Sequence, residues 1–292
     1  MAGLFRRLIV GGVVALFPLW ASADQVERGR YVLIAAGCTA CHTEPKHGAY
    51  LAGGRALRTP FGTFYTPNIT PDRKHGLGAW TESEFVAALR EGVGPDGRHY
   101  FPVFPFTSYT RMRTEDARDL WSYLQTVPAV NQPNRPPELP WYLIRPVAAR
   151  IWKWLFFDAG EFQPDPSRSD EWNRGAYLVR ALGHCGECHT PRNPWGSVKE
   201  DMALSGNPNG PEGDPVPNLT PDRETGLGRW SERDIAWYLE TGARPDGDYA
   251  GSLMAEVIDN DTSRLAVEDR RAIALYLKTL PPISNTAPRG EK

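Results

Sequence analysis

The chain lacks several features that would place it in a common class of protein. Its charges nearly balance, with 33 Lys and Arg against 35 Asp and Glu, so it has no basic excess for binding nucleic acid. No Gly-X-Y period accompanies its 28 glycines and 27 prolines, and its apolar content is an ordinary 41%, which excludes collagen-like and disordered chains. After the first 20 residues, no apolar run approaches the roughly 20 residues that span a bilayer.

Cysteine is scarce as well, and all four cysteines lie in two copies of one motif. Residues 38–42 (CTACH) and 185–189 (CGECH) both read C-x-x-C-H. This is the attachment motif of c-type haem, in which two thiols bind the porphyrin and the histidine ligates the iron. Two disulfides, a thiol redox pair and half a zinc site are the alternatives, but none requires a histidine after both pairs. We expect two covalently bound haem c groups, attached through Cys38, Cys41, Cys185 and Cys188 and ligated by His42 and His189.

Residues 1–23 have the form of a secretory signal peptide. Arg6 and Arg7 precede an apolar stretch over 8–20, and Ala21-Ser22-Ala23 offers an A-x-A cleavage site. An uncleaved anchor is the alternative. Cleavage leaves 269 residues with a net charge of −4. Because covalent haem attachment takes place outside the bacterial cytoplasm, we expect a periplasmic protein, with association with the inner membrane as a further option.

The chain repeats itself at an offset of 150 residues. Residues 68–80 and 218–230 both read N-x-T-P-D-R-x-x-G-L-G-x-W, and Pro-Asp-Gly recurs at 95–97 and 245–247. Such self-similarity indicates one type of domain used twice. We expect a signal peptide over 1–23, a first cytochrome c domain over 24–130, a linker rich in proline and aromatic residues over 131–168, and a second cytochrome c domain over 169–292.

Each repeat reads as a few helices joined by long loops. Thr81 with Glu84, and Ser231 with Asp234, have the spacing of helix N-caps, and these helices end near Gly92 and Gly242. Further helices are expected over 27–36, 172–182, 114–126 and 267–279, with essentially no strands. The predicted fold class is all-α, with two tandem cytochrome c domains and long loops rich in proline and glycine.

A second axial ligand is usual for such haem, and methionine is the common choice. Met254 lies 65 residues after His189, between the second N-x-T-P-D loop and the last helix, and Met112 lies 70 residues after His42. We assign both as axial ligands and expect Met202 to pack. For the first haem, the alternative is that Met112 is a core residue that matches Leu265. The iron would then be ligated by His47, His75 or His99, or would have an open position.

Five further side chains are candidate contacts of the haem propionates or the haem edge, although their repetition could equally reflect turn geometry: Tyr65, Asn68, Trp80, Asn218 and Trp230. The linker carries a second clue, because residues 140–157 mix aromatic side chains with Arg145, Arg150 and Lys153. Such a stretch suits a membrane surface or a partner subunit. The alternative is that it packs between the two haem domains and fixes their distance.

Residues 101–112 (FPVFPFTSYTRM) and 183–193 (GHCGECHTPRN) resemble segments of the cytochrome c subunits of bacterial periplasmic, membrane-associated dehydrogenases that oxidise alcohols, gluconate or aldehydes. Many of those subunits carry three haems and a C-terminal membrane helix, whereas this chain has two motifs. The resemblance implies a non-catalytic carrier that passes electrons from a periplasmic dehydrogenase to a downstream acceptor of the respiratory chain. The alternatives are a dihaem enzyme of the peroxidase or thiosulfate dehydrogenase type, with one open or displaceable haem ligand, and a free-standing periplasmic electron shuttle.

Overall fold

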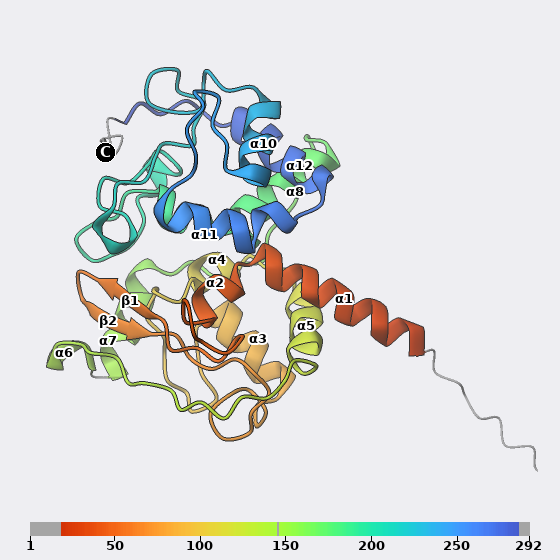
Figure 1. Ribbon diagram of the computed structural model, residues 1–292. Helices are drawn as coiled ribbons and strands as arrows, with labels where there is room; N and C mark the ends of the chain where they lie inside the picture. Colours follow the sequence, from red (N-terminus) through yellow and green to blue (C-terminus); the bar gives the residue numbers. More distant parts are fainter. Residues whose placement is uncertain (1–18, 145, 286–292) are drawn as a thin grey trace, which may run out of the picture.

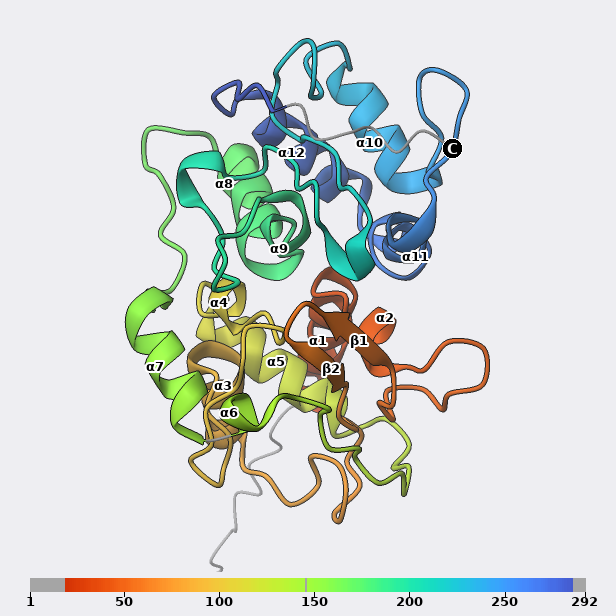
Figure 2. The same cartoon turned by 90° about the vertical axis from the view of Figure 1, so that its left-hand side faces the viewer.

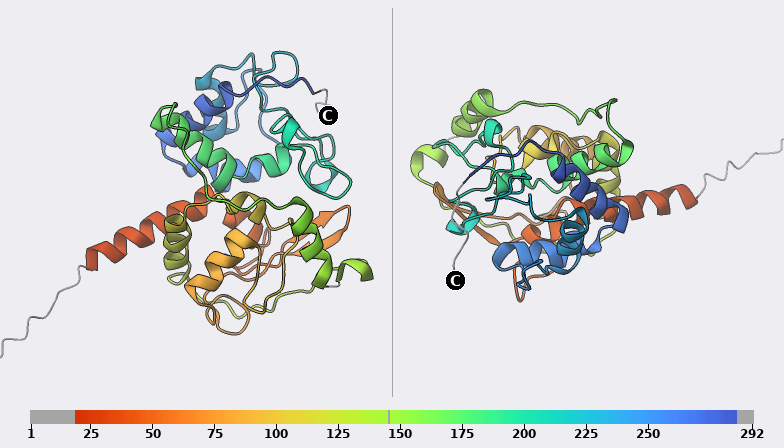
Figure 3. Two further views of the ribbon diagram at one scale, coloured as in Figure 1. Left: turned by 180° about the vertical axis from the view of Figure 1, so that it is seen from behind. Right: turned by 90° about the horizontal axis from the view of Figure 1, so that it is seen from above.

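The computed structural model describes residues 19–144 and 146–285 (Figure 1). Most of the expected signal peptide, and Arg145 of the linker, lie outside these residues. The described chain is helical, apart from one antiparallel hairpin of β1 (Ala56–Thr59) and β2 (Gly62–Tyr65). This hairpin was not expected from the sequence. Figures 1 and 3 show two groups of helices, one from each half of the chain, that meet along one junction.

The N-terminal half is organised by a long first helix and its partner near the end of the half. α1 (Leu19–Ala35) leads into α2 (Cys38–His42) and packs along α5 (Thr114–Leu124). Along the chain, α3 (Glu82–Glu91) and α4 (Phe106–Tyr109) come between α2 and α5, and α3 packs on both α4 and α5. The contact of α1 with α5 is close because Gly29 has no side chain: a Cβ there would lie 1.9 Å from the Asp119 carbonyl oxygen.

The C-terminal half repeats this arrangement. α8 (Asp170–Tyr177) continues as a π-helical turn (Leu178–Leu182) into α9 (Gly186–His189), and it packs along α12 (Val267–Lys278). Gly175 takes the place of Gly29, since a Cβ there would lie 2.0 Å from the Ala272 carbonyl oxygen. α10 (Glu232–Thr241) packs on α12, and α11 (Ser252–Asn260) lies at the junction with the N-terminal half (Figure 1).

The local predictions for helix ends are confirmed. Thr81 and Ser231 both form capping boxes, in which the hydroxyl accepts from the third residue of the helix and the acid there bonds back to the cap. Gly92 and Gly242 end the two helices in the left-handed region, at φ 60° and 74°. The helices expected over 27–36, 172–182, 114–126 and 267–279 are all present, within a few residues of the expected ends except that α1 begins eight residues earlier.

The linker forms two short helices on the outside of the N-terminal half. α6 (Trp141–Ile144) and α7 (Pro146–Phe156) lie at the margin of the molecule (Figures 1 and 2). Trp152 of α7 packs edge-on to Phe106 of α4 and donates from Nε1 to the Trp195 carbonyl oxygen, at 2.9 Å. The linker therefore contacts both halves, but along the margin of the junction. Among the described residues, no helix has both the length and the apolar character needed to cross a bilayer.

Candidate haem-attachment sites

The two C-x-x-C-H motifs form the short helices α2 and α9, each directly after the first long helix of its half. Gly37 adopts φ 64° between α1 and α2, a conformation that favours glycine, and so allows the sharp change of direction. All four cysteine side chains are half-buried. Burial raises the pKa of each thiol, to about 11 for Cys185 and about 12 for Cys188.

Each motif histidine is held by one hydrogen bond of the same kind. His42 Nδ1 lies 2.8 Å from the Pro67 carbonyl oxygen, and His189 Nδ1 lies 2.8 Å from the Pro217 carbonyl oxygen. Because a carbonyl oxygen only accepts, Nδ1 carries the proton and Nε2 has a free lone pair for a metal. Burial lowers the pKa of both imidazoles, that of His189 to about 4, so both rings are neutral at pH 7. Two thiols and an oriented Nε2 fit a covalently attached haem.

The carbonyls that orient these histidines belong to the repeated N-x-T-P-D loops. Asn68 and Asn218 follow Pro67 and Pro217 and are almost fully buried. Asn68 Oδ1 accepts from the backbone and hydroxyl of Thr70, and its Nδ2 donates to the Val130 carbonyl oxygen at 2.7 Å. Asn218 makes the equivalent bonds to Thr220 and Ile283. Both amides therefore stabilise the conformation of the loop through hydrogen bonds. This supports turn geometry as the reason that the two asparagines repeat.

The other candidate contacts lie in different surroundings. Tyr65 donates from its hydroxyl to Glu138 at 2.7 Å and has the Arg135 guanidinium 3.7 Å from its ring centroid, so it contacts the linker. Trp80 and Trp230 are partly buried against the core in corresponding positions of the two halves. These two side chains stay predictions as contacts of the haem edge.

Met112 is more deeply buried than the other two internal methionines. Met112 is fully buried in the core, at 0% exposure, and its N–H donates to the Tyr109 carbonyl oxygen. Met254 lies on α11, half-buried against the same core, while Met202 ends a short 3₁₀ turn (Glu200–Met202). Leu265, the counterpart of Met112, is also buried. The ligand assignments of Met112 and Met254 stay predictions, and the setting of Met112 suits a core residue as well as a ligand.

Two tyrosines join the halves in a nearly symmetric way. Tyr31 of α1 donates to Asp269 at 2.6 Å and accepts from the Ala266 N–H at 3.0 Å, both at the start of α12. Tyr177 of α8 donates to Asp116 and accepts from the Arg113 N–H at 3.0 Å, both at the start of α5. Each half thus contributes a tyrosine from its first helix to the last helix of the other.

The attachment helices themselves lie at this junction. Glu187, inside the second motif, accepts from Thr107 and Ser108 of α4, at 2.6 and 2.9 Å. Burial acts to raise the pKa of Glu187, but Arg192 at 2.6 Å and the two hydroxyls outweigh it, and the pKa is lowered. Glu187 is therefore an anion that ties the second motif to the N-terminal half.

Arg55 connects the first motif to the C-terminal half. Arg55 donates to the Ala40 carbonyl oxygen, inside the first motif, at 2.7 Å, and to Glu256 of α11 at 2.5 Å. Each attachment helix is thus held against the segment that precedes the last helix of the other half. Sequence reasoning missed Glu187 and Arg55, and the repeat gave no sign of them, because their partners lie about 80 and 200 residues away.

A buried acid lies beside the first motif. Asp261 is 6% exposed, and within the described chain its Oδ1 has no hydrogen-bond partner. Its other carboxylate oxygen would lie 3.1 Å from a Cβ at Gly37, and burial raises the pKa of Asp261 to about 7. The Nε2 of His184 would lie 3.8 Å from the same Cβ, and the His184 ring packs edge-on to Tyr109, with 5.5 Å between the ring centroids. His184 therefore has a packing role at the junction.

Comparison with known proteins agrees with this chemistry. Residues 26–128 match the family model for cytochrome c. The chain is 43% identical to a "Diheme cytochrome c-type" protein of Cereibacter sphaeroides over 264 residues, which cover 89% of this chain and 87% of that one. It is 38% identical to the cytochrome c subunit of the quinone alcohol dehydrogenase of Gluconobacter oxydans, and 39% to that of the gluconate 2-dehydrogenase of Pantoea cypripedii.

Those two alignments cover 88% and 87% of this chain but only 55% and 59% of the dehydrogenase subunits, so the chain spans a little over half of their length. The similarity to the Cereibacter protein extends over nearly the whole of both chains. Together with the two motifs, it shows that the chain belongs to the c-type cytochromes, whose cofactor is covalently bound haem c.

Proposed function

We propose that this chain is a dihaem electron carrier, which accepts electrons from a periplasmic dehydrogenase and delivers them to an acceptor of the respiratory chain. The observation that carries the proposal is the pair of matched motifs, each with two thiols and a histidine whose Nδ1 is held 2.8 Å from a carbonyl oxygen. The names of the relatives that serve alcohol and gluconate dehydrogenases support a dehydrogenase partner.

Each half of the chain supplies one set of ligands. Residues 24–130 form the first cytochrome c domain, with Cys38, Cys41, His42 and Met112. Residues 169–292 form the second, with Cys185, Cys188, His189 and Met254. Residues 1–23 are the signal peptide that exports the chain to the periplasm, and 131–168 are the linker. Bound haem c supplies a one-electron carrier whose potential is set by its axial ligands and its surroundings.

The protein's own contribution is orientation and spacing. The Pro67 and Pro217 carbonyls fix the histidine rings, and the Arg55 and Glu187 contacts hold each attachment helix against the opposite half. Since both motifs lie at one junction, an electron that enters one half has a short route to the other. If His42 with Met112, and His189 with Met254, hold the two irons, neither iron would have a position left for a substrate, and the chain would carry electrons without catalysis.

One observation favours a second candidate function, a dihaem enzyme. The residue that matches Met254 in the first half is Phe104, which packs against Tyr100 and Tyr109, and Met112 is fully buried in the core. If Met112 does not ligate, the first iron has an open position, as a dihaem peroxidase or thiosulfate dehydrogenase requires. We propose the carrier because the named relatives are cytochromes and cytochrome subunits.

The test is carbon monoxide binding by the purified holoprotein, with a pyridine haemochrome assay for haem content. We expect two haems per chain and no carbon monoxide binding. Met254→Leu and Met112→Leu should each open one haem to carbon monoxide, and Met202→Leu, the matched control, should open none. If the unmodified protein binds carbon monoxide at one haem and Met112→Leu changes nothing, the carrier proposal is wrong and the enzyme takes its place.

A further inference from the structure

α6 and α7 present an exposed apolar surface on the outside of the molecule. On α7, the exposed side chains recur at helical spacing: Val147 at 52%, Ile151 at 50%, Trp154 at 83% and Leu155 at 55%. Trp141, Tyr142 and Ile144 of α6 add three more, at 71%, 55% and 62%. We call these seven side chains the linker face. Such a grouped set, unlike scattered exposed residues, marks an interaction site.

The opposite side of α7 is already satisfied by packing within the chain. Ala149 is 2% exposed, and Trp152 contacts Phe106 and Phe156. Lys153 donates from Nζ to the Glu91 carbonyl oxygen and lies over the rings of Phe106 and Phe157. α7 is therefore held firmly to the molecule with its second apolar side outward, so the linker face is not an unpacked part of the core.

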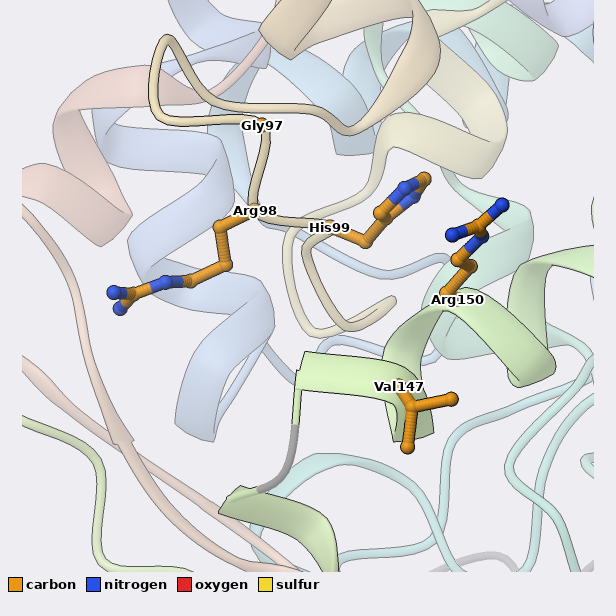
Figure 4. A pocket seen from close by; sticks show the side chains of 5 residues that line it. All are labelled: Gly97, Arg98, His99, Val147 and Arg150. Carbon is orange, nitrogen blue, oxygen red and sulfur yellow. The ribbon is translucent and has the colours of Figure 1, made fainter.

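Two adjoining hollows run along this face. One, of about 310 Å³, is lined by Gly97, Arg98, His99, Val147 and Arg150, and the other, of about 330 Å³, by Val147, Arg150, Ile151 and Trp154. Figure 4 shows the His99 ring beside the Arg150 side chain, with Arg98 pointing away on the other side of the loop. In the described chain, the buried Nδ1 of His99 has no hydrogen-bond partner. Among the described residues that line the two hollows, none is acidic.

The charge of this region is opposite to that of the rest of the chain. From 139 to 157 the sequence has no Asp or Glu and three cations, Arg145, Arg150 and Lys153, although the whole chain carries −2. The acids at either end are engaged: Glu138 with Tyr65, and Asp158 with Arg111 at 3.6 Å. Arg98 lies 3.5 Å from Asp96, and among the described residues Arg150 is the principal exposed cation beside His99.

Cations beside tryptophan, tyrosine and branched aliphatic side chains are typical of helices that lie in a membrane interface. A phospholipid offers both things that the linker face matches: a phosphate for the cationic hollow and acyl chains for the apolar side chains. We propose that the linker face docks on a bilayer that contains anionic phospholipid, with a lipid phosphate between Arg150 and His99. This rests on the export proposed above, and it is independent of how the haem irons are ligated.

The test is sedimentation of the mature holoprotein with vesicles of phosphatidylcholine, with and without phosphatidylglycerol. We expect binding that needs phosphatidylglycerol and weakens with salt. Arg150→Glu should weaken it roughly 30-fold, because the substitution changes the charge by two units and each unit near an anionic surface contributes about fivefold. Trp154→Ala should also weaken it, because it removes the most exposed apolar side chain of the linker face. Trp237→Ala and Lys74→Glu, which change exposed side chains elsewhere, should leave it unchanged.

Two results would overturn the proposal. If phosphatidylcholine alone binds as well, or the control variants weaken binding equally, the attachment is not specific to this face and this charge. If neither vesicle binds, the face serves a protein, such as the dehydrogenase subunit. Haem content and carbon monoxide binding are measured on the same variants, and normal values there separate failure of the membrane proposal from failure of the electron-carrier proposal.

Discussion

Replacing Tyr177 with phenylalanine should loosen the junction between the two halves. The Tyr177 side chain is fully buried, and its hydroxyl bonds to the Asp116 carboxylate and to the Arg113 N–H of the other half. Phenylalanine keeps the ring, and hence its contacts with Phe162 and with the Arg113 guanidinium. The substitution therefore removes only the two hydrogen bonds across the junction.

The loss of stability depends on how many hydrogen bonds the partners of each tyrosine hydroxyl keep after the substitution. A hydrogen bond to a charged group contributes about 1.5–3 kcal/mol, and the Arg113 N–H adds up to about 1 kcal/mol, so Tyr177→Phe should cost about 3 kcal/mol. Tyr31→Phe is the matched control, because its hydroxyl makes the equivalent bonds to Asp269 and Ala266. Asp269 keeps Arg174, at 2.8 and 2.6 Å, so Tyr31→Phe should cost only about 1 kcal/mol.

Urea unfolding followed by far-UV circular dichroism measures both variants against the unmodified holoprotein. We expect a lower midpoint for Tyr177→Phe, and a split into two transitions if the halves then unfold separately. Equal losses for the two variants would refute the reasoning that Arg174 compensates for the missing hydroxyl. A loss below about 0.5 kcal/mol for Tyr177→Phe would show that the hydroxyl does not hold the junction.

Two other changes test buried charges. Arg192→Ala should lower the free energy of unfolding in urea by about 3 kcal/mol, because the buried Glu187 loses its cation. Adding Glu187→Gln to that variant should recover part of the loss. No recovery would mean that Glu187 is not an anion. The pKa of Asp261 is raised to about 7 by burial, so the folded state binds this proton more tightly than the unfolded state. Its contribution to stability should fall as pH rises from about 4 to about 7 and stay low above that, and Asp261→Asn should be up to about 4 kcal/mol more stable at high pH. An unchanged pH profile of unfolding in Asp261→Asn would contradict this.

Many features were predictable because they depend on residues close together in the chain. A C-x-x-C-H motif places two thiols and an imidazole on one helical turn wherever it occurs. The caps at Thr81 and Ser231 need only the acid three residues later, and both were confirmed. The repeat at an offset of 150 also gives Pro67 and Pro217 equivalent positions in the two halves, each directly before its N-x-T-P-D loop.

Other features depend on pairings that no local pattern encodes. The Tyr31 and Tyr177 contacts join residues 238 and 61 positions apart, and Glu187 meets α4 across 80 positions. The hairpin β1–β2 is held partly by Glu138 of the linker, whose backbone exchanges hydrogen bonds with Thr63. Which residues meet in this way is set by how the two halves pack together.

The sequence by itself therefore predicted the haem-attachment motifs, the capped helices with the first and last long helices of each half, and the twofold repetition, since helical geometry acts over one or two turns. Only the tertiary structure decided that both motifs lie at a common junction, that Met112 is fully buried while Met254 is half-exposed, and that the aromatic linker faces outward. These depend on long-range packing, in which a side chain is buried or exposed according to what the rest of the chain places against it.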